Sequence, residues 1–276
     1  MLQTRLGAPV TTFGDYAVPE ETVSAYHENG FALCPRIAAE QALDEVLAFL
    51  RPLLLQPAPQ ADGMLYDYCA VDGVQRDPEI LQLLLPCDYE PRLFDSEVFA
   101  NAASVARALL GMPVFYRGSH YIEKPGPRQN PTPAHQDEAF WDPSALHTAV
   151  AVWFPLQDAT RGNGALYFVP GGHREEDVLP HRHLQDDPRI HGLEIVPGHV
   201  DESHARLLEV PRGSASVHHC RVVHGAGPNR TPHTRSAFIL NFATQPRTLA
   251  TPRAFPWQVS TSLKAARRGE RKIELP

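Results

Sequence analysis

The sequence predicts a mainly β fold of the β-sandwich or jelly-roll kind, with a helical layer formed by its N-terminal part. Helical patterns fill about residues 15–110. Short segments of alternating apolar and polar residues, separated by turns rich in Gly, Pro and Asn, fill about 111–250. No linker-like composition separates the two parts, and lone helices would need the sheet to bury their apolar faces. We therefore expect residues 1–276 to form a single domain.

The helices are predicted from apolar spacing and from start and stop signals. VPEETVSAYHENG has Pro19 at a helix start, acidic residues in the first turn and Gly30 as a stop. AAEQALDEVLAFLRPLLL has apolar residues at helical spacing. Two shorter helical patterns are DPEILQLLL and DSEVFANAASVARALLG, the second ended by Gly111. Between the first two helices, FALCP is typical of a short strand.

The strands are expected where apolar residues alternate with polar ones or run through a short buried segment. The segments are PVFYRGSHYIEKPG, HTAVAVWFPLQ, GALYFVPGGH, LLEVPRGSASVHH and RSAFILNFA.

Residues 174–206 interrupt this pattern. They carry many charges with little periodicity, so we expect a long surface loop inserted into the strand-rich part. Irregular spacing rarely builds one coordination shell, and the histidines of this loop are therefore interpreted as solvated. These are His181, His183, His191, His199 and His204.

Composition excludes several classes of protein. The formal net charge is −7, which argues against nucleic-acid partners and against binding to an anionic membrane. No apolar run approaches the roughly 18 residues of a membrane span, and no signal peptide is recognisable at the start. The four cysteines are scattered without a CxxC motif, which favours free thiols in the cytoplasm. The basic KAARRGERK near the end is expected to be a solvated tail. Nothing predicts the oligomeric state.

The stretch NPTPAHQDEAFWDP suggests chemistry. His135 and Asp137 are two residues apart, and residues i and i+2 of a strand point to the same face. An imidazole and a carboxylate could therefore meet at one point as part of a metal site. Taken alone, the pair is a weak signal, because an Asp that caps a turn beside a surface His has the same pattern.

A downstream stretch supplies the partners of this pair. His224 ends an apolar run in VVHGAGPN, and Arg235 begins the apolar segment SAFILNF eleven residues later. Two histidines and a carboxylate form the facial triad of non-haem Fe(II) oxygenases. An arginine at the start of a buried strand is costly without an anionic partner, and its planar fork suits a carboxylate. A metal chelated by a 2-oxo acid, with Arg235 on the acid's far carboxylate, would explain all four residues.

With these motifs in order, the sequence resembles the phytanoyl-CoA dioxygenase family of Fe(II)/2-oxoglutarate-dependent oxygenases. The motifs are HQD followed by an aromatic pair, then AVWFPLQDATRGNGALYFVPGGHR, then VVHGAGPN with its arginine, within Tyr116 to Phe242. The resemblance implies a double-stranded β-helix, a cupin-like jelly roll. It implies that His135, Asp137 and His224 are iron ligands.

The resemblance also suggests cosubstrate residues. Arg235 would bind the C5 carboxylate of 2-oxoglutarate, Trp153 would line its pocket, and Lys124 occupies a position from which some relatives contact it. Asn163 matches an Asn-Gly turn of the family. Three positions need comment. Ser214 replaces an Asp and could loosen a turn, Ala226 replaces a Ser and supplies no hydroxyl, and His219 is either a packed strand residue or a partner of the ligands.

The resemblance implies that the chain uses Fe(II), 2-oxoglutarate and O2 to hydroxylate an unactivated C–H bond of a small organic molecule, releasing succinate and CO2. The Asp ligand favours hydroxylation over halogenation; desaturation, epoxidation and cyclisation stay open. Candidate substrates are an amino-acid derivative, a lipid-like acid or a natural-product intermediate, and Lys124 and Arg128 suggest an acidic group. The substrate is expected between the 174–206 loop and the N-terminal helices, contacting Tyr121, Arg128, Gln136, Phe140 and Trp141.

Two other classes of function remain open from the residues alone. The chain could be a non-catalytic jelly-roll protein that binds or senses a ligand, which would not need an open iron site. It could also be a hydrolase that holds Zn²⁺ on the same three ligands, which would leave Arg235 unexplained.

Overall fold

The computed structural model describes residues 5–71 and 77–258. Two antiparallel sheets form its centre, as the jelly-roll prediction requires. The larger sheet has seven strands in the order β1 (Phe31–Cys34), β12 (Ala215–His219), β7 (Ala149–Pro155), β14 (Arg235–Ala243), β4 (Phe115–Lys124), β3 (Leu81–Leu84) and β2 (Leu65–Asp67). The smaller sheet has four, in the order β11 (Arg206–Leu208), β8 (Leu166–Val169), β13 (Val223–Ala226) and β5 (Thr132–His135).

Shorter elements complete the chain. Two further two-stranded pairs are β9 (His181–His183) with β10 (Leu193–Ile195), and β6 (Ala145–Leu146) with β15 (Arg247–Thr248). The α-helices are α1 (Glu20–Asn29), α2 (Glu40–Leu53), α3 (Pro57–Ala61), α4 (Pro86–Tyr89) and α5 (Glu97–Leu110). The 3-10 helices are η1 (Pro91–Asp95), η2 (Asp137–Phe140), η3 (Arg161–Asn163), η4 (Gly172–Arg174), η5 (Leu184–Asp186), η6 (Glu202–His204) and η7 (Pro256–Gln258).

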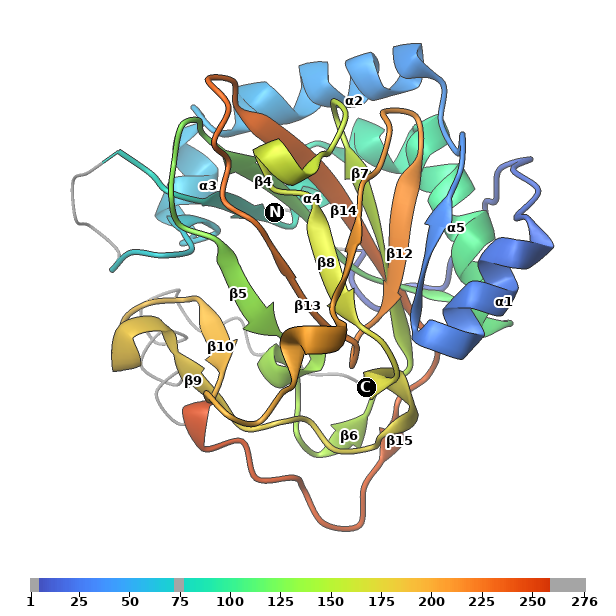
Figure 1. Cartoon of the computed structure of the whole chain (residues 1–276). Coiled ribbons are helices and arrows are strands. Elements are labelled where there is room, and N and C mark those ends of the chain that lie inside the picture. Colours follow the sequence, from blue (N-terminus) through green and yellow to red (C-terminus); the bar gives the residue numbers. More distant parts are fainter. Residues whose placement is uncertain (1–4, 72–76, 259–276) are drawn as a thin grey trace.

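The predicted helices α1, α2 and α5 are confirmed. Gly30 ends α1 in the left-handed conformation, with φ of 85°, and donates its N–H to the carbonyl of Tyr26. Ser96 caps α5 by accepting a hydrogen bond from the N–H of Phe99. Helices α2 and α5 lie on the side of the larger sheet away from β5, β8 and β13 (Figure 1). They form the helical layer that the sequence predicts.

Alternation along β7 and β14 divides the interior into two layers. Val152 and Phe154 of β7 pack with the helices, together with Phe238 of β14. Trp153, between them in sequence, points to the opposite face and packs against residues such as Phe168 of the smaller sheet. The space between the two sheets is therefore separate from the helical core, and it is where the polar motif residues meet.

One helix prediction is wrong. Within DPEILQLLL, residues Leu81–Leu84 form β3, which pairs with β4 on one side and β2 on the other. Leu83 enters the helical core, whereas Gln82 and Leu84 face the space between the sheets. A leucine-rich segment has no decisive period of its own, so pairing with the open edge of β4 determines its structure.

The prediction of a solvated 174–206 loop is also partly wrong. The segment contains the β9–β10 pair, and His181, His183 and His191 are buried, whereas His199 and His204 are exposed. Buried imidazoles bond backbone carbonyls here: Nδ1 of His181 lies 2.6 Å from the oxygen of Leu179, and Nδ1 of His183 lies 3.0 Å from that of Ile190. The irregular spacing of these histidines therefore does not mean that they are solvated. Those on the β9–β10 pair are buried and bonded to backbone carbonyls.

Two expectations from composition meet the structure as follows. All four cysteines are buried, and none of them forms a disulfide. Within the described ranges 5–71 and 77–258, no helix has the length and apolar character needed to cross a bilayer. The basic segment KAARRGERK lies outside the described residues.

The central strands predict a stability effect. Phe154→Ala would remove a fully buried ring between β7 and the helices and is expected to lower the free energy of unfolding by about 3–5 kcal/mol. The measurement is urea denaturation. Leu55→Ala, at a side chain 88% exposed, is the control and should change it by less than about 0.5 kcal/mol. Equal effects of the two variants would contradict the placement of the core.

Candidate functional site

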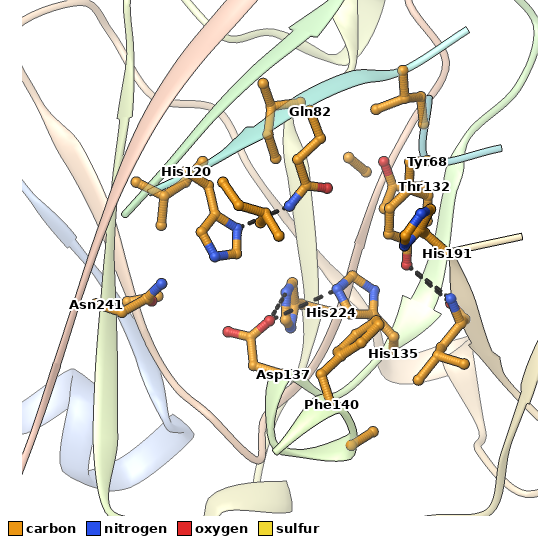
Figure 2. Close-up of a pocket in the computed structure, with 18 of the residues that line it drawn as sticks. Tyr68, Gln82, His120, Thr132, His135, Asp137, Phe140, His191, His224 and Asn241 are labelled. Atoms are coloured by element: carbon orange, nitrogen blue, oxygen red, sulfur yellow. Dashed lines mark hydrogen bonds and ion pairs between the residues drawn. The ribbon is translucent and has the colours of Figure 1, made fainter. Parts of the chain in front are cut away.

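Strand pairing brings the predicted metal ligands together. His224 on β13 is the register partner of His135 at the end of β5, and their ring centroids lie 4.3 Å apart. Asp137 follows two residues later as the first residue of η2, where the chain turns back toward both rings. The three side chains therefore converge between the two sheets (Figure 2).

The donor atoms face one point. Oδ1 of Asp137 lies 3.8 Å from Nε2 of His135 and 3.6 Å from Nε2 of His224. The other ring nitrogens are engaged: Nδ1 of His135 lies 2.9 Å from the oxygen of Pro133, and Nδ1 of His224 lies 3.0 Å from that of Val222. A carbonyl oxygen only accepts, so each Nδ1–H donates and leaves the Nε2 lone pair facing Asp137.

The protonation states also suit a metal. Burial lowers the pKa of His135 and of His224, which favours neutral imidazoles. Burial alone would raise the pKa of Asp137, but the electrostatic attraction of the neighbouring His224 ring and the hydrogen bond from His218 lower it well below its usual value. Two neutral imidazoles and one carboxylate form the donor set of the facial triad. Among the described residues, no other cluster of His, Cys, Asp and Glu converges in this way.

Arg235 is a buried cation for which the described residues supply no anionic partner. It begins β14, the central strand of the larger sheet, and is 2% exposed. Its guanidinium lies 5.4 Å from the ring centroid of Trp153, and its Nε has no hydrogen-bond partner among the described residues. Burial lowers its pKa to about 10, so it stays protonated at neutral pH. Burying an unpaired guanidinium is costly, and a carboxylate ligand would remove that cost.

Lys124 has a different environment from the one expected. It is the register partner of Arg235 on β4 and only 1% exposed, but it does not line the cavity. Its Nζ donates to the carbonyl of Gly227 at 2.9 Å and to that of Ala226 at 3.5 Å. The ammonium thus ties β4 to the turn after β13, and its position supports no direct contact with 2-oxoglutarate.

A cavity of about 930 Å³ surrounds these residues, and Arg235 and the metal-binding candidates lie in its wall. Trp153 lines it, as do Phe140 and Trp141 after the first two ligands. The sequence did not single out several further lining residues: Tyr66, Tyr68, Gln82, His120, Asn241 and Trp257. It indicated no definite role for His218, which also lines the cavity. Tyr66, Gln82 and His120 belong to β2, β3 and β4, and only His120 lies in a segment that the sequence predicted as a strand.

Three of the expected substrate contacts lie elsewhere, and these are corrections. Tyr121 packs in the helical core and donates its hydroxyl to Oε1 of Glu123 at 2.5 Å, because it occupies the other face of β4. Arg128 lies near the surface, where its guanidinium is 3.6 Å from Asp77 and 4.0 Å from Glu79. Neither residue lines the cavity.

Gln136, the third, is buried between the two ligands but points away from the cavity. Its amide nitrogen donates to the carbonyl of Arg221 at 2.7 Å, and its amide oxygen accepts from the N–H of Leu179 at 2.8 Å. It follows from the alternation of a strand that the residue between His135 and Asp137 points to the opposite side.

The walls of the cavity also differ in part from the prediction. Helices α1, α2 and α5 do not line it; the N-terminal part contributes β2, β3 and the neighbouring residues Asp62, Met64 and Tyr68. The 174–206 segment does contribute, through His183, His191 and Leu193.

The departures from family motifs have local explanations. Ser214 follows Gly213, which has φ of 87°, and its hydroxyl accepts the N–H of Arg36, so this turn is well bonded. Asn163 shapes its predicted turn through a capping box with Thr160.

His219 does not line the cavity. Its Nδ1 accepts the N–H of Arg221 at 3.1 Å, and burial lowers its pKa to about 3. This is the packed strand residue of the two alternatives.

Comparisons with known proteins agree with this geometry. The family model for phytanoyl-CoA dioxygenase (PhyH) matches residues 26–237. The chain belongs to the phytanoyl-CoA dioxygenase family. Members of this family and related enzymes recur among its relatives and structural neighbours, and the antiparallel jelly roll is their fold.

Individual relatives are more distant. The chain is 29% identical over 139 residues to a probable alpha-ketoglutarate-dependent hypophosphite dioxygenase of Stutzerimonas stutzeri, covering 50% of this chain and 48% of that protein. It is 24% identical to the ectoine dioxygenase of Streptomyces anulatus, covering 87% of this chain and 82% of that protein. The matched segments span about half the length of several other curated relatives. The crystal structure of EvdO2 from Micromonospora carbonacea var. aurantiaca complexed with 2-oxoglutarate shares 32% identity and a TM-score of 0.74, covering 90% of this chain and 99% of that one.

A buried ion-pair network holds the ligand turn in place. Glu138, next to Asp137, is fully buried; its Oε2 lies 2.8 Å from Nη1 of Arg221 and its Oε1 lies 2.7 Å from Nη2 of Arg253. Oε1 also accepts the N–H of His147 at 3.0 Å. The carboxylate therefore joins η2 to the segment before β13 and to the C-terminal segment.

Glu138→Gln is expected to lower the free energy of unfolding by about 3–5 kcal/mol, because it leaves two largely buried guanidinium groups without a counter-charge. Denaturant unfolding measures this loss. The control is Glu176→Gln, whose partner Arg247 is 58% exposed, and its loss should be at most about 1 kcal/mol. A loss at Glu138 no larger than at Glu176 would contradict a structural role for the network.

Proposed function

We propose that the chain is an Fe(II)/2-oxoglutarate-dependent oxygenase that hydroxylates an unactivated C–H bond of a small organic molecule. One observation carries the proposal: a facial triad and a buried guanidinium without an anion share one cavity. The triad alone would serve several metals, and the arginine alone would bind any carboxylate. Together they match a metal chelated by 2-oxoglutarate, and family membership supports the same chemistry.

The donor set fits Fe(II), and the cavity has a cationic residue in its wall that fits the cosubstrate. His135, Asp137 and His224 would occupy one face of the metal and leave the others open. The unpartnered Nε of Arg235 would pair with the far carboxylate of 2-oxoglutarate, with Trp153 beside the guanidinium. Ala226 contributes no hydroxyl to this carboxylate, so the proposal assigns its binding to Arg235.

With 2-oxoglutarate and O2, bound iron supplies the oxidising power that breaks a C–H bond, as 2-oxoglutarate is converted to succinate and CO2. The chain itself binds and orients the iron, the cosubstrate and the substrate, and it excludes water from the site. The carbonyls of Pro133 and Val222 fix both ligand rings, and Phe140 and Trp141 line the cavity beside the metal-binding candidates. The carboxylate of Asp137 would occupy the position that a halide needs, which favours hydroxylation over halogenation.

The charges of the cavity favour a neutral substrate. Among the described residues, four charged side chains line it: Asp62, Asp137, Asp142 and Arg235. Asp137 and Arg235 belong to the metal and cosubstrate, so the remaining lining charges are acidic. Neither Lys124 nor Arg128 reaches the cavity, which removes the basis for an acidic substrate. A neutral natural-product intermediate or an uncharged derivative fits better than a lipid-like acid.

The compartment is a smaller part of the proposal. Four buried cysteines that form no disulfide are typical of proteins kept in a reducing environment, and we propose the cytoplasm as the site of action.

Arg235 gives the first test of the function. Under anaerobic conditions, Fe(II) and 2-oxoglutarate should produce a weak visible charge-transfer band in the wild type. Arg235→Gln should need at least about tenfold more 2-oxoglutarate for the same band, because one charge-assisted pair contributes roughly 1.5–3 kcal/mol. Arg161→Gln, at an exposed residue of η3, is the control and should match the wild type.

The rival functions predict different results. Absence of a band in wild-type protein whose bound iron has been verified would contradict the oxygenase proposal. Tight Zn²⁺ binding with no effect of 2-oxoglutarate would favour a hydrolase. A protein that binds neither metal nor 2-oxoglutarate would favour a binding or sensing role.

The substrate argument has its own test. A long-chain acyl-CoA is expected to leave the rate of succinate release by the iron-loaded protein unchanged, because its phosphates would find no free lysine or arginine in the described cavity wall. Coupled detection of succinate measures this rate. A several-fold stimulation would show that anionic substrates are accepted and would overturn the neutral-substrate proposal.

A further inference from the structure

A third histidine lies beside the triad. His218 is on β12 of the larger sheet, is 3% exposed, and lines the cavity. Its ring centroid lies 4.3 Å from that of His224. Strand alternation separates it from its neighbour His219, which does not line the cavity. The donor atoms that converge on one point belong to His135, Asp137 and His224 and not to His218. We therefore assign His218 a role other than metal ligand.

The two oxygens of Asp137 have different surroundings. Oδ1 faces the ligand nitrogens, at 3.8 Å from Nε2 of His135 and 3.6 Å from Nε2 of His224. Oδ2 lies 3.3 Å from Nε2 of His218. A metal held by both imidazoles would meet Oδ1, whereas Oδ2 is turned toward β12.

The second nitrogen of His218 supports a donor role for the first. Nδ1 is buried and has no hydrogen-bond partner among the described residues. Nε2 lies 3.3 Å from Oδ2 of Asp137, and a carboxylate oxygen only accepts hydrogen bonds. The proton therefore belongs on Nε2, where it is donated to the carboxylate.

We propose that His218 is a positioning residue that keeps Asp137 a one-oxygen ligand. This inference rests on the proposed iron site. A carboxylate can bind a metal through one oxygen or two, and the hydrogen bond to Oδ2 occupies the second oxygen. An iron held by His135, Asp137 and His224 would also have to accept 2-oxoglutarate and O2, so a second oxygen from Asp137 would compete with them. His218 thus acts through Asp137 and does not touch the metal.

The test compares three variants by anaerobic titration of Fe(II) in the presence of 2-oxoglutarate, followed by the charge-transfer band. His218→Leu keeps a similar volume and removes the donor. His218→Gln places an amide N–H near the position of Nε2. His219→Gln, one residue along the strand and outside the cavity wall, is the control.

We expect His218→Leu to weaken Fe(II) binding by about 10-fold or more and to shift the band, because partners of metal ligands typically contribute that much to affinity. His218→Gln should restore both values to within a few-fold of wild type, and His219→Gln should match it. Loss of packing alone cannot explain rescue by Gln. If the Leu variant does not fold, His218→Asn replaces it, since Asn is too short to reach Oδ2.

The outcomes separate the inference from the function. A wild-type band with unchanged affinity and band position in all His218 variants would overturn the role of His218 and leave the oxygenase proposal intact. Equal damage from Leu and Gln would also overturn it, as would evidence from the iron-loaded protein that the imidazole of His218 is itself a ligand. Absence of the band in wild type would instead count against the proposed function.

Discussion

The site depends on the register between β13 and β5. His224 lies opposite His135 in that pair, and the ladder shifts just beyond it, between His224 and Ala226. Because side chains alternate, a slip of one residue would turn one imidazole to the other face of the smaller sheet and separate the donors. The carbonyl partners of both rings lie two residues before each histidine, on the same strands or just before them. Register therefore determines position and ring orientation together.

A second constraint is the unpaired charge at the start of β14. A guanidinium in the centre of a seven-stranded sheet opposes folding unless a ligand or a nearby ring offsets it, and Trp153 offers only the ring. Beside it, Lys124 is buried as well but is satisfied by the carbonyls of Ala226 and Gly227. These two neighbouring basic side chains thus have different roles. Lys124 ties β4 to the turn after β13, whereas Arg235 can still bind an anionic ligand.

Motif spacing was enough to predict that His135, Asp137, His224 and Arg235 meet at one site, and the order of helical and strand-like segments was enough to predict the jelly roll. Caps and apolar spacing were likewise enough for α1, α2 and α5. The substrate wall could not be predicted in this way. Tyr121 and His120 are adjacent on β4, and only the packing of the helices decides that Tyr121 faces the core and His120 the cavity. The fate of Leu81–Leu84 and of the buried histidines of the 174–206 segment likewise depends on pairing with distant strands.

The neighbouring carboxylates Asp137 and Glu138 show why one of them is available to a metal. Glu138 is fully buried, and two arginines and the N–H of His147 engage its oxygens. A metal would have to displace these partners, at the cost of two uncompensated guanidinium groups. The side chain of Asp137 is 25% exposed, and its ion-pair partners among the described residues are the imidazoles of His135, His218 and His224. The network around Glu138 therefore anchors the turn and at the same time leaves Asp137 as the carboxylate that can bind iron.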